Sequence, residues 1–454
     1  MNPLPTSLLR IRALLGTALV LSVGALLAFL TRPAAGTSLR PTFTSTESGV
    51  RIDAKVSHPA VTPYGTEFFA EYTVTLPEGV VPSAQRVSIA VVLDRSGSMN
   101  GVKLVDAQLA VNRLVDLLQD GDQLALVDFG SEVESTRLYD ISEATRAELH
   151  ARVNQLTANG GTNISAGLER GRELLTNATG ARRLILISDG QPTEGLTASF
   201  MLAGAVGRIH DEQTTVTALG VGNDYDGTLL SLLSERGGGM LGHLQDVAQL
   251  EEVLGKELAA ARLSVARNVE LTLTADGADF VDAPGRNLVW SPQGQRLFLA
   301  DLRPGLPTRV VVRLRSRPDA EDFAAVDARV SWSALSGKRS DTKVPLEVAV
   351  IDDVNVVNRG RDESVFARGV TAMGTVRMLA AASAYERGDD ALGSSLLDEA
   401  RGVFGMSADA LAGQTEVENV RTRLRSAGAV ERKTFNYGLE KKTLVNFGRE
   451  NEGY

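Results

Sequence analysis

The sequence predicts an α/β domain that is inserted in, or flanked by, a β-sandwich and is followed by a C-terminal helical region. Apolar runs alternate with helical patterns across residues 85–262, which is typical of βαβ units around a parallel sheet. Residues 37–84 and 263–352 are instead rich in β-branched residues, with the alternation expected of strands. From residue 358 to about residue 428 the pattern is helical. These changes of pattern define the predicted domains.

The composition is that of a globular protein and excludes several classes of function. At roughly 150 residues per domain, 454 residues suffice for about three units. The net charge of −9 gives no general basic field for a phosphate backbone, so we expect no nucleic-acid partner. The chain has no cysteine, which excludes disulfides, thiolate zinc sites, iron–sulfur clusters and cysteine nucleophiles. The four scattered histidines leave little for a histidine-based metal site.

Residues 1–36 are predicted to be a signal peptide or an N-terminal membrane anchor. Arg10 and Arg12 precede an uninterrupted run of apolar or small residues from 13 to 30, and small residues suited to cleavage follow as far as Gly36. The run is long for a signal-peptide core and just long enough to span a bilayer, so both interpretations stay open. In either case we expect an exported protein that is periplasmic, extracellular or anchored to the membrane by this segment.

The two β-rich stretches are expected to form one sandwich. Residues 67–75 of the first stretch, and residues 309–315 and 328–332 of the second, have the β-branched and alternating character of strands. The first stretch has about fifty residues, which are few for an independent sandwich. We therefore expect the α/β domain to be an insertion in a single sandwich built from both stretches.

The helical region is expected to brace the β domain. Its pattern predicts one helix over residues 363–387, a second that follows Gly388 and ends near Arg401, and a third over residues 409–425. The C-terminal tail, residues 431–454, mixes lysine, arginine, glutamate and aromatic residues without a clear period. For that tail the sequence predicts no structure.

Oxygen-bearing side chains follow the first strand of the α/β domain. Residues 86–93 form a near-continuous apolar run of the kind that is buried on both faces, and Asp94, Ser96 and Ser98 come directly after it. A spacing of two places these side chains in one tight loop, and Gly97 permits the bend. Hard divalent cations such as Mg²⁺ prefer oxygen ligands. Taken alone, however, the pattern fits a polar turn before a helix equally well.

Two further segments favour the metal site. Thr162 follows a pair of glycines and precedes a predicted helix, and Asp189 ends a second apolar strand that begins at Arg183. In an open parallel sheet, the loops after the carboxyl ends of neighbouring strands converge on one crevice. Thr162 and Asp189 can then face Asp94, Ser96 and Ser98.

Together these residues resemble the complete metal-ion-dependent adhesion site of a von Willebrand factor type A domain. Asp94-x-Ser96-x-Ser98, Thr162 and Asp189 match that motif in order and spacing, and no position is missing. The resemblance covers the middle two-fifths of the chain and implies a Rossmann-like fold that binds Mg²⁺, with Mn²⁺ and Ca²⁺ as alternatives. It implies that Ser96, Ser98 and one of Thr162 and Asp189 bind the ion directly, with Asp94 acting through water.

The resemblance also implies a non-enzymatic binding function. Mostly neutral ligands leave the ion much of its charge and an open position, which a partner protein's Asp or Glu carboxylate can occupy. The expected role is therefore cell adhesion or the assembly of an envelope complex. An accessory regulatory subunit of an envelope channel, transporter or ATPase complex is the alternative, and a metal-dependent hydrolase is a further one. The flanks are similar in layout to exported bacterial relatives of the calcium-activated chloride channel regulators.

Overall fold

The computed structural model describes residues 40–47, 49–78, 86–222, 225–244, 247–320, 322–334 and 336–449. The predicted signal peptide or membrane anchor, residues 1–36, lies outside these residues. Within the described part of the chain, no helix combines the length and the apolar character needed to cross a bilayer.

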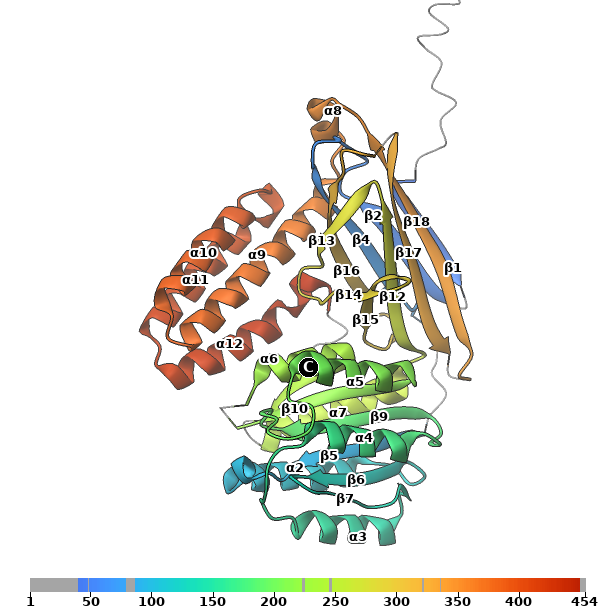
Figure 1. Ribbon diagram of the computed structural model, residues 1–454, viewed down its shortest axis with the longest axis vertical. Helices are drawn as coiled ribbons and strands as arrows, with labels where there is room; N and C mark the ends of the chain where they lie inside the picture. Colours follow the sequence, from blue (N-terminus) through green and yellow to red (C-terminus); the bar gives the residue numbers. More distant parts are fainter. Residues whose placement is uncertain are drawn as a thin grey trace, which may run out of the picture. The chain divides into compact units, whose positions relative to one another are not determined.

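The two β-rich stretches form two sheets together, as the sequence predicts (Figure 1). The first sheet has the order β1 (Thr42–Glu47), β2 (Val50–Val56), β4 (Glu67–Thr75), β16 (Thr308–Ser316) and β13 (Ala278–Asp282). The second has the order β14 (Val289–Ser291), β15 (Gly294–Leu299), β12 (Ala266–Asp276), β17 (Phe323–Ala334), β18 (Arg339–Val350) and β3 (Ala60–Val61). Antiparallel pairing of β4 with β16, from Val74 opposite Thr308 to Glu67 opposite Arg315, joins the two stretches. The α/β domain is therefore inserted in the sandwich.

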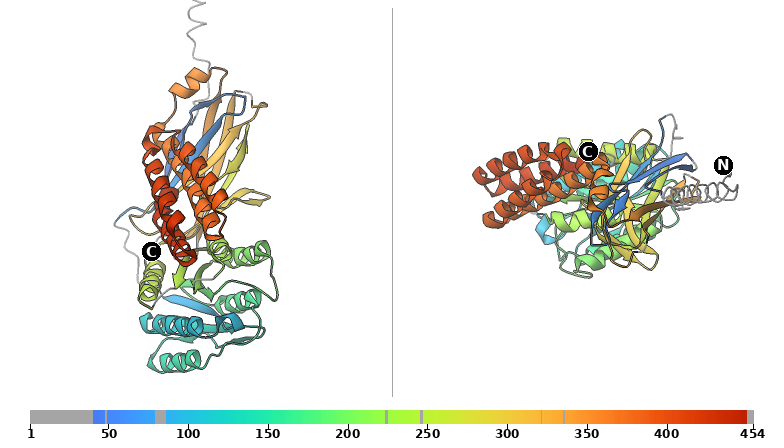
Figure 2. Two further views of the ribbon diagram at one scale, coloured as in Figure 1. Left: turned by 90° about the vertical axis from the view of Figure 1, so that its left-hand side faces the viewer. Right: turned by 90° about the horizontal axis from the view of Figure 1, so that it is seen from above.

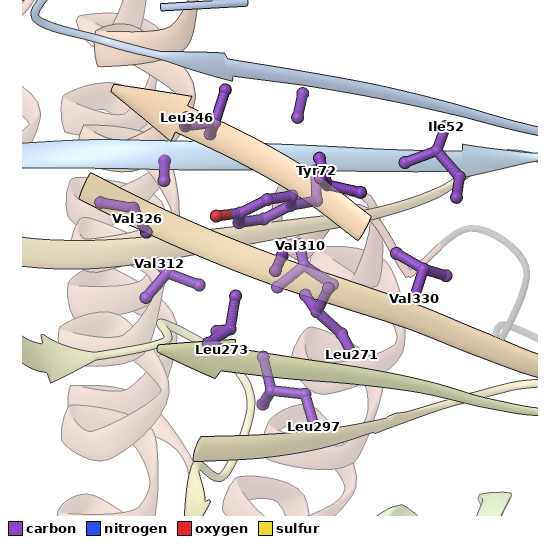
Figure 3. Packing of buried hydrophobic residues seen from close by; sticks show 14 of the residues in the cluster. Ile52, Tyr72, Leu271, Leu273, Leu297, Val310, Val312, Val326, Val330 and Leu346 are labelled. Atoms are coloured by element: carbon purple, nitrogen blue, oxygen red, sulfur yellow. The ribbon is translucent and has the colours of Figure 1, made fainter. Parts of the chain in front are cut away.

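The inward faces of both sheets form one apolar core (Figure 3). Strand β2 shows why, because every second residue from Val50 to Val56 is buried and the residues between them are more exposed. Ile52 and Tyr72 of the first sheet pack in the same cluster as Leu271 and Val326 of the second. The alternation in the sequence thus fixes which face of each strand lies inside the sandwich.

The α/β domain is built on a sheet with parallel central strands (Figure 1). Its order is β11 (Gly238–Leu244), β10 (Thr214–Val221), β9 (Ala181–Ser188), β5 (Val87–Asp94), β6 (Gln123–Phe129) and β7 (Val133–Ser135), and β8 (Tyr139–Asp140) also pairs with β6. Strands β7 and β8 are antiparallel to β6, whereas β5, β6, β9, β10 and β11 are parallel to their neighbours in that series.

Helices cover both faces of this sheet. They are α2 (Val102–Leu117), α3 (Glu143–Asn154), α4 (Ile164–Leu175), α5 (Ser199–Asp211), α6 (Gly227–Arg236) and α7 (Val247–Leu263). Strand β5 contributes Ile89 and Val91 to a core with α2, α3 and α7, and Ala90 and Val92 to a second core with α4, α5 and α6. All eight residues of β5 are buried, as expected for a central strand of a parallel sheet.

The C-terminal region is helical, and its residues 363–443 pack on one side of the sandwich, as both views in Figure 2 show. It comprises α8 (Val354–Arg359), α9 (Glu363–Glu386), α10 (Asp390–Phe404), α11 (Ala412–Ser426) and α12 (Ala429–Thr443). Phe69 of β4 and Val311 of β16 lie in the same apolar cluster as Val365 and Val370 of α9. The Arg368 guanidinium on α9 donates two hydrogen bonds to the Glu71 carboxylate on β4. Helix α12, apart from its first two residues, lies in the stretch for which the sequence predicts no structure.

Candidate metal centre

The first three predicted ligands lie together at the carboxyl end of β5. Asp94 is the last residue of the strand, and its Oδ1 accepts a hydrogen bond of 2.8 Å from the Ser96 backbone N–H. The hydroxyl oxygens of Ser96 and Ser98 are 3.0 Å apart. Asp94 and Ser96 are buried, whereas Ser98 is exposed. The loop therefore gathers three oxygen-bearing side chains, with Ser98 on the solvent side.

Backbone hydrogen bonds hold the loop that carries Thr162 against the first loop. The Gly97 N–H donates to the Gly160 carbonyl at 3.0 Å, and the Asn159 N–H donates to the Arg95 carbonyl at 2.7 Å. Thr162 itself is buried, and its N–H donates to the Thr193 hydroxyl in the loop after β9 at 2.9 Å. Thr162 therefore lies between the loops that follow β5 and β9.

Asp189 directly follows β9, the strand next to β5. Its neighbour Ser188 links the two strand ends, because the Ser188 hydroxyl donates to Asp94 Oδ2 at 2.6 Å and accepts a 2.9 Å bond from the Gly190 N–H. One carboxylate oxygen of Asp189, Oδ2, lies 3.1 Å from the ammonium nitrogen of Lys103. The other, Oδ1, is buried and has no hydrogen-bond partner among the described residues.

The negative charges of Asp94 and Asp189 repel each other at the carboxyl ends of β5 and β9. Burial raises the pKa of Asp94, and the negative charge of Asp189 raises it further, while hydrogen bonds from Ser188 and Ser96 oppose the rise. Two buried like charges are costly unless a cation balances them. The described structure supplies one such cation, the Lys103 ammonium.

Part of the chain is similar in sequence to known proteins. Residues 88–256 match the family model of the von Willebrand factor type A domain. The chain contains a von Willebrand factor type A domain. Inter-alpha-trypsin inhibitor heavy chain H1 of Mesocricetus auratus is 33% identical over 163 residues, which are 34% of this chain and 18% of that protein. Uncharacterized protein YfbK of Escherichia coli (strain K12) is 27% identical over 188 residues, which are 40% of this chain and 32% of that protein. The match thus spans about a fifth to a third of these relatives.

Solved structures resemble the chain beyond the von Willebrand factor type A domain. A von Willebrand factor type A protein from Catenulispora acidiphila covers 90% of this chain and 99% of its own, with a TM-score of 0.64 and 17% identity. The ArnB paralog VWA2 from Sulfolobus acidocaldarius covers 89% of this chain and 100% of its own, with a TM-score of 0.59 and 16% identity. At these identities the similarity concerns the fold alone.

The residues at the strand ends of the von Willebrand factor type A domain fit a hard divalent cation. They offer carboxylate and hydroxyl oxygens only, which is the donor chemistry that Mg²⁺, Mn²⁺ and Ca²⁺ share. The buried Asp189 Oδ1, which has no hydrogen-bond partner in the described structure, is an oxygen that such an ion would satisfy. Within the described residues no group of three or more histidine, aspartate or glutamate side chains forms a metal site, so this site depends on its hydroxyls.

Sequence reasoning missed two residues of this centre. In the sequence Ser188 is only the last residue of an apolar strand. The pairing of β9 with β5 is what brings its hydroxyl into hydrogen-bond distance of Asp94. Lys103 lies in the first turn of α2, where no sequence signal connects it to Asp189. Both roles depend on contacts between segments that are distant in the chain.

Proposed function

We propose that the chain is an exported protein whose von Willebrand factor type A domain binds an acidic group of a protein partner through a divalent cation. Asp94, Ser96, Ser98, Thr162 and Asp189 would hold the ion, which is Mg²⁺ in our proposal. The observation that carries the proposal is the buried Asp189 carboxylate, which has one oxygen without a partner among the described residues and lies close enough to Asp94 to raise its pKa.

The donor set explains why an acidic partner is expected. When bound, the ion would supply a positively charged centre with a free coordination position for a carboxylate. The hydroxyls of Ser96 and Ser98 would bind the ion without adding negative charge, and Ser98 is exposed on the solvent side of the loop, where a partner's carboxylate could approach. Asp94 and Asp189 would supply the negative charge that holds the ion, and Ser188 and the Ser96 N–H fix the orientation of Asp94.

A binding function also agrees with the surroundings of the histidines. His58 contacts Ser57, His150 contacts Asn112 and Asp116, and His210 contacts the Gly237 carbonyl. These contacts lie outside the proposed metal loops, so none of these three side chains is placed as a general base beside them. We therefore propose a non-enzymatic role in adhesion or envelope assembly.

Export is proposed from the N-terminal sequence alone. Arg10 and Arg12 followed by the apolar run of residues 13–30 favour secretion or membrane anchoring. Determination of the N-terminal residue of the protein from its native host by mass spectrometry tests this part, since cleavage near Gly36 would distinguish a signal peptide from an anchor.

The metal site is tested by thermal unfolding with Mg²⁺ and with EDTA. Saturation at about a hundred times Kd should stabilise the wild type by about 2.7 kcal/mol, and Asp94→Ala should abolish this gain. Asp128→Asn is the matched control, because Asp128 is a buried aspartate at the end of the neighbouring strand β6, where it pairs with Arg95 and Arg152. That variant should lose stability but keep the Mg²⁺ effect. An equal Mg²⁺ effect in the wild type and Asp94→Ala would disprove the site.

The acidic partner is tested with immobilised peptides. Peptides with a central Asp or Glu should retain the protein in Mg²⁺, and the same peptides with Asn or Gln should not. Retention should be lost in EDTA and in Asp189→Ala. Retention that survives both treatments would contradict binding through the metal.

A further inference from the structure

A lysine ammonium already lies at the proposed metal centre. Lys103 Nζ is 3.1 Å from Asp189 Oδ2, and the side chains are only 19% and 5% exposed, respectively. This ion pair is therefore largely shielded from water. In such surroundings a charge interaction is stronger than on an open surface. The same Asp189 keeps its second oxygen, Oδ1, without a hydrogen-bond partner in the described residues.

The position of Lys103 on its helix makes a purely local role unfavourable. It is the second residue of α2, which begins at Val102 and has Gly101 as its N-cap. The amino end of a helix carries a partial positive charge, so a lysine in the first turn destabilises the helix. This ammonium makes a favourable contact with Asp189, in a loop that lies 86 residues further along the chain. The contact with the Asp189 carboxylate therefore offsets part of the cost of a lysine at this end of the helix.

We propose that Lys103 is an exchangeable counter-ion of the metal centre, which neutralises Asp189 in the metal-free protein and competes with the divalent cation for that carboxylate. This inference rests on the proposed function, because it concerns the same site. It adds a residue that sets the affinity for the cation and that lies outside the five proposed ligands.

The charges explain the direction of the effect. Asp94 and Asp189 bring two negative charges to the buried side of the site, and Lys103 brings one positive charge. A cation at Asp189 Oδ1 would lie on the same carboxylate as the Lys103 ammonium, 3.1 Å from Oδ2, so the two positive charges would repel each other even if each kept its own oxygen. A cation that takes both oxygens would displace the ammonium. The flexible four-carbon stem of lysine allows this withdrawal without movement of the helix. Lys103 therefore stabilises the metal-free fold and lowers the affinity for the cation.

The test is the Mg²⁺ affinity of the full chain, measured by isothermal titration calorimetry after removal of metal with EDTA and dialysis. Lys103→Met keeps the apolar stem and removes the charge, so it should bind Mg²⁺ about ten times more tightly than the wild type. Lys103→Arg keeps the charge and should stay within about twofold of the wild type. Arg113→Met is the matched control for net charge, because it lies on the same helix about 15 Å away along the axis.

Thermal unfolding gives a second readout. In EDTA, Lys103→Met should melt below the wild type, because Asp189 loses its counter-ion, and saturating Mg²⁺ should remove this difference. A merely structural lysine would weaken Mg²⁺ binding when replaced, which is the opposite sign. If Lys103→Met does not fold without metal, the Mg²⁺ affinity of Lys103→Gln decides the question.

The outcomes separate this inference from the proposed function. An unchanged or weaker Mg²⁺ affinity in the neutral variants overturns the counter-ion role and leaves the metal site intact. A wild type that binds no Mg²⁺ overturns both. Tighter binding in the neutral variants, with wild-type affinity in Lys103→Arg and Arg113→Met, supports both.

Discussion

Replacing Glu440 with glutamine is expected to stabilise the C-terminal helical region at alkaline pH and to leave it almost unchanged at acidic pH. Glu440 lies on α12 and lines a cavity of about 460 Å³, whose other walls include residues of α6, α9 and the turn between β13 and β14. Burial raises the pKa of this carboxyl from 4.5 to about 7, and the charge of Glu386 on α9 adds to the rise, while Arg449 opposes it. Ionised Glu440 is therefore unfavourable in the folded chain.

The size and sign of the effect follow from this rise. Because the folded pKa lies above the unfolded value, the folded state binds the proton more tightly, and stability falls as the pH rises from 4.5 to 7. At about 1.4 kcal/mol for each pKa unit, the full penalty above pH 7 is about 3 kcal/mol, and at pH 5 it is below about 1 kcal/mol. Water in the cavity would reduce both values, so they are upper bounds.

Amide hydrogen exchange of α12, followed by mass spectrometry at pH 5 and pH 8.5, measures the effect locally. Glu440→Gln should increase the protection free energy of α12 by up to about 3 kcal/mol at pH 8.5 and by less than about 1 kcal/mol at pH 5. Glu132→Gln, an exposed glutamate in the α/β domain, is the control and should match the wild type at both values. An equal gain for Glu440→Gln at both pH values would refute the reasoning, because it would mean that the carboxyl is not penalised by its charge.

The remaining predictions concern one residue at the metal centre and one between domains. Ser188→Ala removes the hydroxyl that holds Asp94 Oδ2, and should weaken Mg²⁺ binding about 10-fold to 100-fold in calorimetry; unchanged affinity would show that Asp94 needs no such support. Asp301→Ala should cost about 1 to 3 kcal/mol in urea denaturation, because Asp301 pairs with buried Arg183 at 2.6 Å and accepts a 3.0 Å bond from the Asn268 N–H, while Glu257 at 3.4 Å still balances the charge of Arg183. A loss below about 1 kcal/mol would contradict a buried ion pair there.

The sequence predicted the elements whose burial pattern is apolar and periodic. Strand β5 is a near-continuous apolar run that is buried on both faces, and α9 begins at the residue that the pattern indicates. Helix α12 escaped prediction because its buried residues are Asn436, Leu439 and Thr443, two of which are polar. A helix that buries amide and hydroxyl groups against its neighbours leaves no hydrophobic period in the sequence.

The residues of the candidate site also fall into those that the sequence predicted and those that it did not. Asp94 and Asp189 follow apolar strands, and the rule for parallel sheets predicts that such strand ends converge. The contacts of Ser188 and Lys103 could not be predicted, because they depend on the register of β9 against β5 and on the course of α2. Site residues whose position depends on strand ends could be predicted from the sequence, whereas those whose role depends on side-chain packing could not.

The insertion of the α/β domain determines which ends of its parallel strands face the sandwich. Arg183, which pairs with Asp301, lies near the start of β9, and Gly238, which approaches the Leu299 carbonyl, is the first residue of β11. Asp189 lies six residues beyond Arg183, which is about 20 Å along an extended strand. These contacts with the sandwich are therefore made at the amino ends of the parallel strands, while the proposed ligands lie at the carboxyl ends. A partner that approaches Ser98 would meet the carboxyl ends of the strands, away from these contacts. The sandwich can therefore carry the domain without covering the proposed site.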